Sequence, residues 1–208
     1  MRTKKTFKRV AYMLTMTVLA ISLTLSSQAA LRGYAAYRDK AFIGGQYSGH
    51  AGIVDMVTTD GRPVFYTHHP GTGTLTWVNA TTFQAPGQCT YYGEFYKPGY
   101  GASKYADIAD LAYDLYYDYS IYYVATCQMT LTTPATSIPT AKIEPQYVYE
   151  MRCDGLVEYC YEYYGIELLS TTAGGVSYWN ISNKAHYDIH IESPTHRPMT
   201  QKDKLTLS

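Results

Sequence analysis

The sequence predicts a single α+β domain in which an antiparallel sheet packs against helices. Residues 50–68 hold two short apolar segments around a turn, which is typical of a β-hairpin. Residues 103–119 carry apolar side chains at helical spacing. Residues 153–164 form a second helical pattern, and it begins at a cysteine, Cys153.

Residues 1–29 have the layout of a secretory signal peptide. Five basic residues come first, residues 10–25 are apolar, and Ser27 and Ala29 offer small side chains for cleavage after Ala29. An uncleaved anchor is the alternative, although the apolar run is short for a membrane span. Cleavage leaves residues 30–208 as one domain with its core at about 45–190. We therefore expect a secreted, periplasmic or cell-envelope protein with no membrane span after signal removal.

Charge argues against a nucleic-acid partner. The chain has 17 basic and 17 acidic residues, and the signal segment holds five of the basic ones, so the mature protein carries a net charge of −5. A mildly acidic exported protein lacks the basic surface that binds phosphates.

Tyrosine is abundant, at 24 of 208 residues. These rings favour either half-buried packing positions or a groove that stacks on sugar or peptide.

Five strands are expected along the first two thirds of the chain. Residues 50–57 (HAGIVDMV) and 64–68 (VFYTH) flank an Asp-Gly-x-Pro turn at 58–63 and form the hairpin. Further strands are predicted at 74–83, 90–97 and 121–127. Residues 128–147 are rich in Thr and Pro, which indicates an irregular segment and a candidate active-site flap.

Two helices are predicted. The first spans 103–119, with Ser103 as its cap. Its apolar stripe consists of Ile108, Leu111, Ala112, Leu115 and Tyr119. Its acids, Asp107, Asp110, Asp114 and Asp118, indicate a solvated face rather than a calcium site, because calcium sites usually wrap the ion in a loop.

The second helix spans 153–164 and ends before Gly165. The positions expected in the core are Leu156, Val157, Cys160, Tyr161 and Tyr164. The tail, 189–208, is polar and gives no clear element.

The four cysteines of an exported chain suggest disulfides. Cys153 and Cys160 lie about 10 Å apart along one helix, beyond the roughly 7 Å limit for a disulfide. Cys89 with Cys127 is the simplest pair, and the pairing of Cys89, Cys127 and Cys160 stays open.

Cys153 is predicted at the N-terminus of its helix, where thiols become reactive. Unpaired N–H groups and the positive end of the helix dipole favour the thiolate. The same N–H groups can bind an oxyanion that forms on an attacked carbonyl. Arg152 adds positive potential, whereas Asp154 opposes it. A structural cysteine is the alternative.

A nucleophilic cysteine needs a base, and His50 is the candidate at the start of its strand. A third polar group would orient the imidazole. The antiparallel hairpin returns residues 66–69 to His50, so His68 is the expected third residue, with His69 and Tyr66 behind it. Alternation places Tyr66 and His68 on one face of the strand and His69 on the other.

These motifs resemble a known family. HAGIV followed by VFYTHHPGTG resembles the histidine strand and next strand of the NlpC-type cysteine amidohydrolases, and RCDGLVEYCYEYYGI resembles their nucleophile helix. Because His50 precedes Cys153, the order is similar to the circularly permuted, YiiX-like branch, which is related to lecithin–retinol acyltransferase. The resemblance covers roughly 45–166. It implies a permuted papain-like fold, with Cys153 as nucleophile, His50 as base and a third residue that varies. Asp154 stands where serine is common.

The expected function is hydrolysis of an amide through a thioester acyl-enzyme, without a cofactor. A bacterial cell-wall stem peptide is the expected substrate, and a lipid acyl group is the alternative for the same fold. A catalytically inactive wall-binding module is a third reading, motivated by Asp154. A zinc site of His50, Cys153 and His68 or His69 is permissible, but no HExxH or CxxC spacing supports it.

Overall fold

The computed structural model describes residues 32–43, 46–55, 64–68, 73–84, 89–168, 184 and 198–208. The signal segment, the turn at 58–63 and His69 lie outside these residues, so the predictions made for them stay predictions. Within the described ranges, no helix combines the length and the apolar character needed to cross a bilayer.

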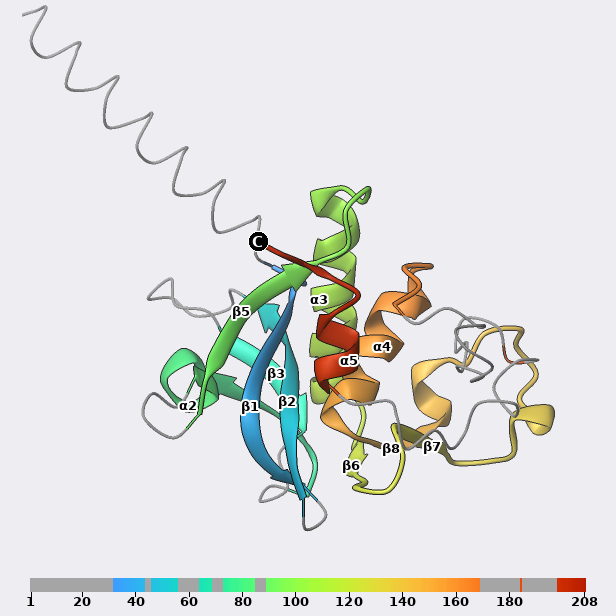
Figure 1. The fold of residues 1–208 in the computed structure, drawn as a ribbon. Helices are drawn as coiled ribbons and strands as arrows, with labels where there is room; N and C mark the ends of the chain where they lie inside the picture. The colour runs from blue at the N-terminus through green and yellow to red at the C-terminus, as the bar shows by residue number, and fades with distance from the viewer. Residues whose placement is uncertain are drawn as a thin grey trace, which may run out of the picture.

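A six-stranded antiparallel sheet forms one side of the molecule, in the order β4-β3-β2-β1-β5-β9 (Figure 1). Its strands are β1 (Ala35–Ile43), β2 (Gln46–Asp55), β3 (Val64–His68), β4 (Leu75–Asn79), β5 (Tyr91–Tyr96) and β9 (Thr206–Leu207). The predicted hairpin is confirmed, since β2 and β3 pair antiparallel with Ile53 opposite Tyr66. The sheet also includes β1 and β9, which lie outside the predicted core range of 45–190.

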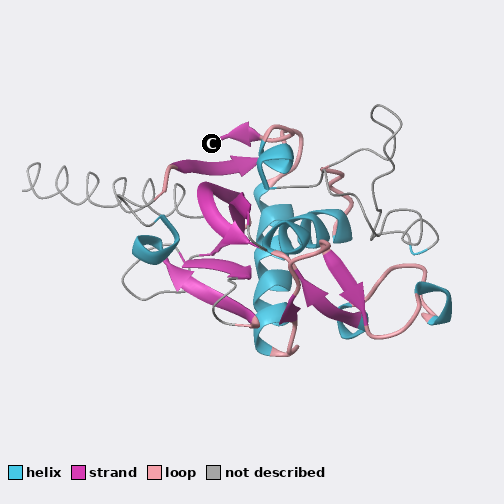
Figure 2. Ribbon diagram, turned by 60° about the horizontal axis from the view of Figure 1, so that its bottom comes forward, coloured by secondary structure: helices cyan, strands magenta, loops and turns pink. Residues whose placement is uncertain are grey.

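Helices gather on one face of this sheet, as Figure 2 shows. They are α3 (Ala102–Tyr117), α4 (Cys153–Tyr163) and the short α5 (Pro198–Lys202). A second sheet, in the order β6-β8-β7, lies beside the start of α4 and contains β6 (Tyr122–Tyr123), β7 (Met129–Leu131) and β8 (Val148–Met151). Two 3-10 turns, at Ala135–Ser137 and Pro145–Tyr147, connect β7 to β8. The prediction of an antiparallel sheet packed against helices is confirmed.

Two apolar clusters hold the sheet. The larger lies between the sheet and the helices and includes Tyr37, Ala51, Tyr66, Leu115 and Cys153. The smaller covers the opposite face and consists of Ala36, Val54, Phe65 and Phe83. Phe83 comes from α2 (Ala80–Gln84), which follows β4 directly.

The helix at 102–117 has the predicted stripe, because Ile108, Leu111, Ala112 and Leu115 are buried, while Tyr119 beyond its end is half-buried. The four aspartates are exposed, which confirms the solvated face. The predicted Ser103 cap is wrong. Gly101 occupies the cap position, and no side chain bonds the first turn there.

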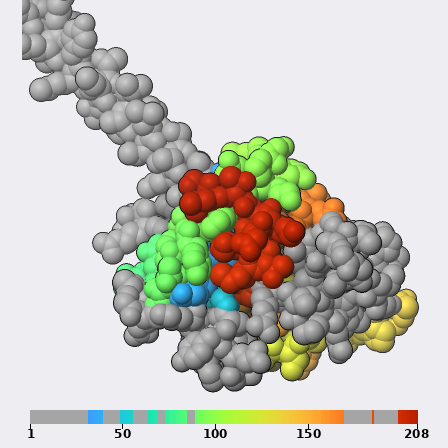
Figure 3. All heavy atoms as spheres, in the orientation of Figure 1, coloured from blue at the N-terminus to red at the C-terminus, as the bar shows by residue number. Residues whose placement is uncertain are grey.

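Several predicted boundaries are also wrong. The strand expected at 74–83 ends at Asn79, whose side chain accepts a hydrogen bond from the Thr82 N–H and starts α2. The strand expected at 121–127 shrinks to β6, and the segment 128–147 contains β7. The polar tail contributes α5 and β9 (Figure 3, red).

No disulfide joins any of the four cysteines, all of which the structure describes, so the predicted Cys89–Cys127 disulfide is not formed. Cys89 contacts Arg38 of the large sheet, at 3.7 Å from Nη1 to Sγ. Cys127 lies beside Met129 of the second sheet, with 3.7 Å between Sγ and the Met129 carbonyl oxygen.

Candidate active site

Cys153 is the first residue of α4, as the sequence predicted. Arg152 precedes it in extended conformation, and the Leu156 N–H makes the first helical bond, to the Arg152 carbonyl. No side chain caps this end. The N–H groups of the first turn and the helix dipole therefore point toward the thiol end of α4.

The thiol of Cys153 is fully buried against β2. Burial is the main reason that the pKa of Cys153 rises to about 12, and the charge of Asp154 raises it further. The backbone N–H of Ala51 and the guanidinium of Arg152 act in the opposite direction. Cys153 thus rests as a neutral thiol, in contact with the residue that follows His50.

The thiol meets β2 where β2 and β3 stop pairing through their backbones. Ile53 and Tyr66 are the last opposed pair toward this end, and the Ala51 carbonyl instead accepts a bond from the Thr67 hydroxyl, at 2.6 Å. Because the N–H and C=O of one strand residue point to the same neighbouring strand, the Ala51 N–H also faces β3. The thiol therefore lies beside the end of the β2–β3 backbone pairing.

Two contacts hold the His50 ring near the end of the β2–β3 pairing. Its ring stacks on Phe83, with centroids 5.4 Å apart, and its Nε2 lies 3.0 Å from Thr67 Oγ1. The single hydroxyl proton of Thr67 is donated to Ala51, so the Thr67 oxygen accepts a hydrogen bond from Nε2–H. Neutral His50 is therefore the Nε2–H tautomer, and Nδ1 carries the lone pair that can take a proton.

The side chains of Cys153 and His50 lie on opposite faces of the sheet. Phe83 belongs to the cluster on the outer face, which places the His50 ring there, whereas Ala51 and Cys153 belong to the cluster under the helices. The structure thus brings the Cys153 thiol to the backbone adjoining His50. A proton that passes between the two side chains must therefore cross from one face of the sheet to the other.

The hydrogen-bond partner of the imidazole is Thr67, whereas the sequence favoured His68. His68 shares the helix-covered face with Tyr66, as alternation predicts, and it is fully buried. Burial lowers the pKa of His68 to about 3, so this ring is neutral. Tyr66 is hydrogen-bonded to Asp55. Alternation in β3 places Thr67 on the face opposite His68, which is the face where the His50 ring lies.

Asp154 is occupied by a salt bridge that the sequence did not reveal. Arg152 donates from Nε to Oδ1 at 2.5 Å and from Nη2 to Oδ2 at 2.8 Å. Asp154 is fully buried, and its charge is a smaller cause of the raised pKa of Cys153 than burial is. The acid therefore opposes the thiolate without dominating it.

A buried polar network joins Asp154 to α5. The amide of Gln128 donates to Asp154 Oδ2 at 3.2 Å and to Glu158 Oε2 at 2.7 Å. The amide of Gln201 donates to the Asp154 carbonyl at 2.7 Å and to Glu158 Oε2 at 3.0 Å. Glu158 and Gln201 are both fully buried. The sequence does not predict this network, because Gln128, Glu158 and Gln201 are polar residues of the kind that usually lie on an exposed surface.

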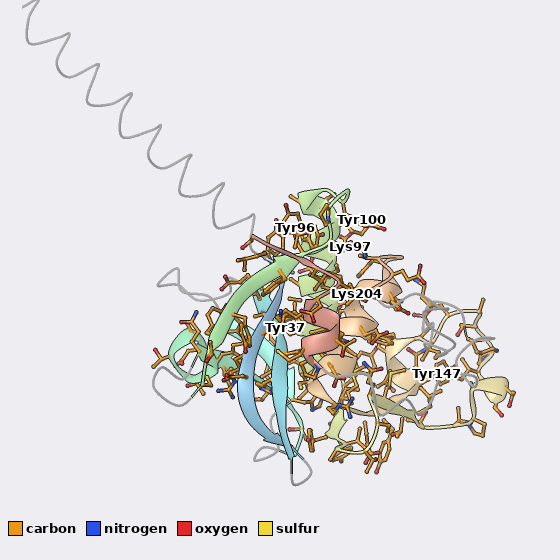
Figure 4. All side chains as sticks on the ribbon, viewed as in Figure 1. Tyr37, Tyr96, Lys97, Tyr100, Tyr147 and Lys204 are labelled. Carbon is orange, nitrogen blue, oxygen red and sulfur yellow. The ribbon has the colours of Figure 1, made fainter. Side chains whose placement is uncertain are left out.

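Two tyrosines border the thiol. Tyr37 of β1, labelled in Figure 4, lies opposite Ala51 in the strand register. Burial raises the pKa of Tyr37, and the charges of Glu158, Asp154 and Cys153 raise it further. Tyr123 of β6 lies beside Met151, two residues before Cys153. Burial and then the charge of Cys153 raise the pKa of Tyr123 to about 12.

Metal ligation finds no support in the part of the chain that the structure describes, where no group of three or more His, Cys, Asp or Glu side chains could hold an ion. The site instead combines a thiol, an oriented imidazole, backbone N–H donors and neutral hydroxyls. No family model, curated protein or solved structure matches the chain significantly.

Proposed function

We propose that this protein is an exported cysteine hydrolase that cleaves an amide through a thioester acyl-enzyme. The observation that carries the proposal is the meeting of Cys153, at the N-terminus of α4, with the β2 residue next to His50, whose tautomer Thr67 fixes. The order and type of these elements support a permuted papain-like arrangement. A cell-wall stem peptide is the proposed substrate, given the signal-like segment and the family resemblance.

The chemistry follows from the tautomer. The proton of Cys153 passes from the helix-covered face of the sheet to His50 Nδ1 on the outer face, and the sulfur attacks the carbonyl carbon to form a C–S bond. N–H groups of the first turn of α4 stabilise the oxyanion. The C–N bond then breaks, and the imidazolium gives its proton to the leaving amine. Water, deprotonated by His50, attacks the thioester and releases the acid, which restores the thiol.

The raised pKa of Cys153 sets a condition on this route. A buried neutral thiol ionises only when a base accepts its proton and donors solvate the sulfur. Substrate must therefore enter and reorganise the site before attack, since Cys153 is fully buried at rest.

The test compares the wild type with Cys153→Ala and His50→Ala on purified muropeptides, with acyl esters as a second substrate set. The proposal expects new amine and acid termini from the wild type and loss of more than about 100-fold in kcat/KM from each variant. Equal turnover by Cys153→Ala would refute it.

The burial of Cys153 favours one competing function, a wall-binding module on an inactive hydrolase fold. That function predicts that wild-type protein sediments with cell-wall sacculi and releases no product. It also predicts that Cys153→Ala binds as well as the wild type does.

A further inference from the structure

Polar atoms without protein partners lie buried near Cys153. Within the described residues, neither ring nitrogen of His68 nor the hydroxyl of Tyr123 has a hydrogen-bond partner. A buried polar group without a partner is destabilising, and native structures contain few. Two such side chains next to each other, with ring centroids 6.4 Å apart, indicate a place that a ligand completes.

Their positions relate them to the nucleophile. His68 ends β3 and faces the helices, and the β2–β3 register, continued by two residues, sets it opposite Ala51, the residue that touches the thiol. Tyr123 pairs with Met151, just before α4 begins. The side chains of Tyr123 and Arg152 are half-buried, so both lie closer to the surface than the fully buried thiol does.

Both groups are uncharged at neutral pH. Tyr123 can donate one hydrogen bond, and neutral His68 can donate one and accept one. Together they offer a donor–acceptor set of the kind that a peptide group satisfies, with its C=O and N–H. An alkyl chain would leave all of these atoms buried and unbonded.

We propose that His68 and Tyr123 form the acyl-group pocket of the site and bind an amide of the substrate adjacent to the scissile carbonyl. The substrate class is then a peptide, and a fatty acyl chain is disfavoured. This inference rests on the proposed function, and it assigns His68 to substrate binding in place of the third-residue role expected from sequence, because Thr67 bonds the His50 imidazole.

The experiment uses two 4-nitrophenyl esters of matched shape, N-acetylglycyl and 4-methylpentanoyl, which differ in the presence of an amide. Rates are corrected for the reactivity of each ester toward a free small thiol. The wild type should prefer the N-acetylglycyl ester by about 100-fold in kcat/KM, because a site built to hydrogen-bond rejects the analogue that lacks the group. Tyr123→Phe and His68→Leu should each reduce this preference by about 10-fold.

Tyr159→Phe is the matched control. The Tyr159 hydroxyl donates to the Ile143 carbonyl at 2.8 Å, away from the proposed pocket. This variant should lower the melting temperature and leave the ester preference unchanged. Tyr123→Phe should keep the melting temperature and reduce the ester preference, since the Tyr123 hydroxyl has no hydrogen bond to lose among the described residues.

The outcomes separate the two claims. If both esters acylate Cys153 equally well, the inference fails and the hydrolase proposal stands. If neither ester acylates Cys153, the hydrolase proposal fails and the inference falls with it. If Tyr123→Phe lowers the melting temperature as much as Tyr159→Phe does, the hydroxyl is structural and the pocket is refuted.

Discussion

Thr67 shows how one hydroxyl can decide the chemistry of a neighbouring histidine. It donates to the Ala51 carbonyl and accepts from His50 Nε2, so it fixes both the ring orientation and the tautomer. Asparagine or histidine is the side chain that sequence reasoning seeks in this role. A threonine in a strand carries no such signal, because threonine is common in strands for its shape alone.

Thr67→Val should reduce kcat/KM by about 10- to 100-fold while keeping the strand shape, because the imidazole loses the group that orients it. The free energy of unfolding should fall by about 1–3 kcal/mol, since buried polar atoms lose a partner. Steady-state kinetics and denaturant titration measure the two effects. Thr67→Ser should recover most of the rate, and Thr76→Val, on neighbouring β4, should change neither. A fully active Thr67→Val protein would contradict the orienting role.

His68 should make stability depend on pH. Its pKa is about 3 in the folded protein and near 6.5 in the unfolded chain, so the unfolded chain binds the proton first. The stabilising contribution is complete above pH 6.5 and is lost as pH falls from 6.5 toward 3, at about 1.4 kcal/mol per pH unit. Urea unfolding of the wild type between pH 7 and 5 should therefore show a steeper loss than His68→Leu does. If the free energies of unfolding of the two proteins change in parallel with pH, His68 is not a buried neutral imidazole.

Helix α4 owes its position to a glycine that the sequence left without a role. A Cβ added to Gly155 would lie 2.0 Å from the carbonyl oxygen of Gln128. Backbone at that distance cannot move aside without shifting the segment that leads into β7. Gly155 thus lets the first turn of α4 approach Gln128, whose amide reaches Asp154 and Glu158.

Gly155→Ala should consequently destabilise the protein by about 3 kcal/mol, because the added methyl group would clash with backbone atoms that cannot move without shifting their whole segment. Thermal unfolding followed by circular dichroism measures the loss. Gly101→Ala is the control, because a Cβ there meets nothing within 4 Å. It should cost less than about 1 kcal/mol. Equal melting temperatures for the two variants would contradict the close packing of α4.

At the same scale, the sequence predicted the elements with strong periodicity. The 64–68 strand and both long helices follow from alternation and from the 3.6-residue repeat, so their existence was readable. β6, β7 and β9 are two or three residues long, and α5 has five, so tertiary pairing rather than a local pattern defines them. The Cys153 position was readable because it depends on helix phase. Thr67, Phe83 and Gln201 were not, because their roles depend on contacts between distant segments.

The C-terminal segment links the main sheet to the helix that carries Cys153. α5 packs on β2 and α4, and β9 pairs with β5, so residues 198–208 join the sheet to the nucleophile helix. Gln201 makes this junction polar and buried through its bonds to Asp154 and Glu158. Substrate entry and the C-terminal segment are therefore expected to be coupled.

Gln201→Ala should lower the free energy of unfolding by about 2–3 kcal/mol, since two buried acceptors lose a donor. It should also raise the rate at which iodoacetamide labels Cys153, because α5 releases from α4 more often. Peptide mass spectrometry measures the labelling site by site. Lys202→Ala, which removes a pair between Lys202 and exposed Asp203, should change stability by less than about 1 kcal/mol. If Gln201→Ala destabilises the protein but labels Cys153 at the wild-type rate, α5 does not control access to Cys153.

We propose that Cys153 is the nucleophile and His50 is its base. Mass spectrometry of the protein, quenched in acid during turnover of N-acetylglycyl 4-nitrophenyl ester, tests both roles at once. One added acyl group is expected on the peptide that contains Cys153, and it should form at least about 100-fold more slowly in His50→Ala. Turnover with no acyl group on Cys153, or an adduct that forms equally fast without the His50 imidazole, would contradict it.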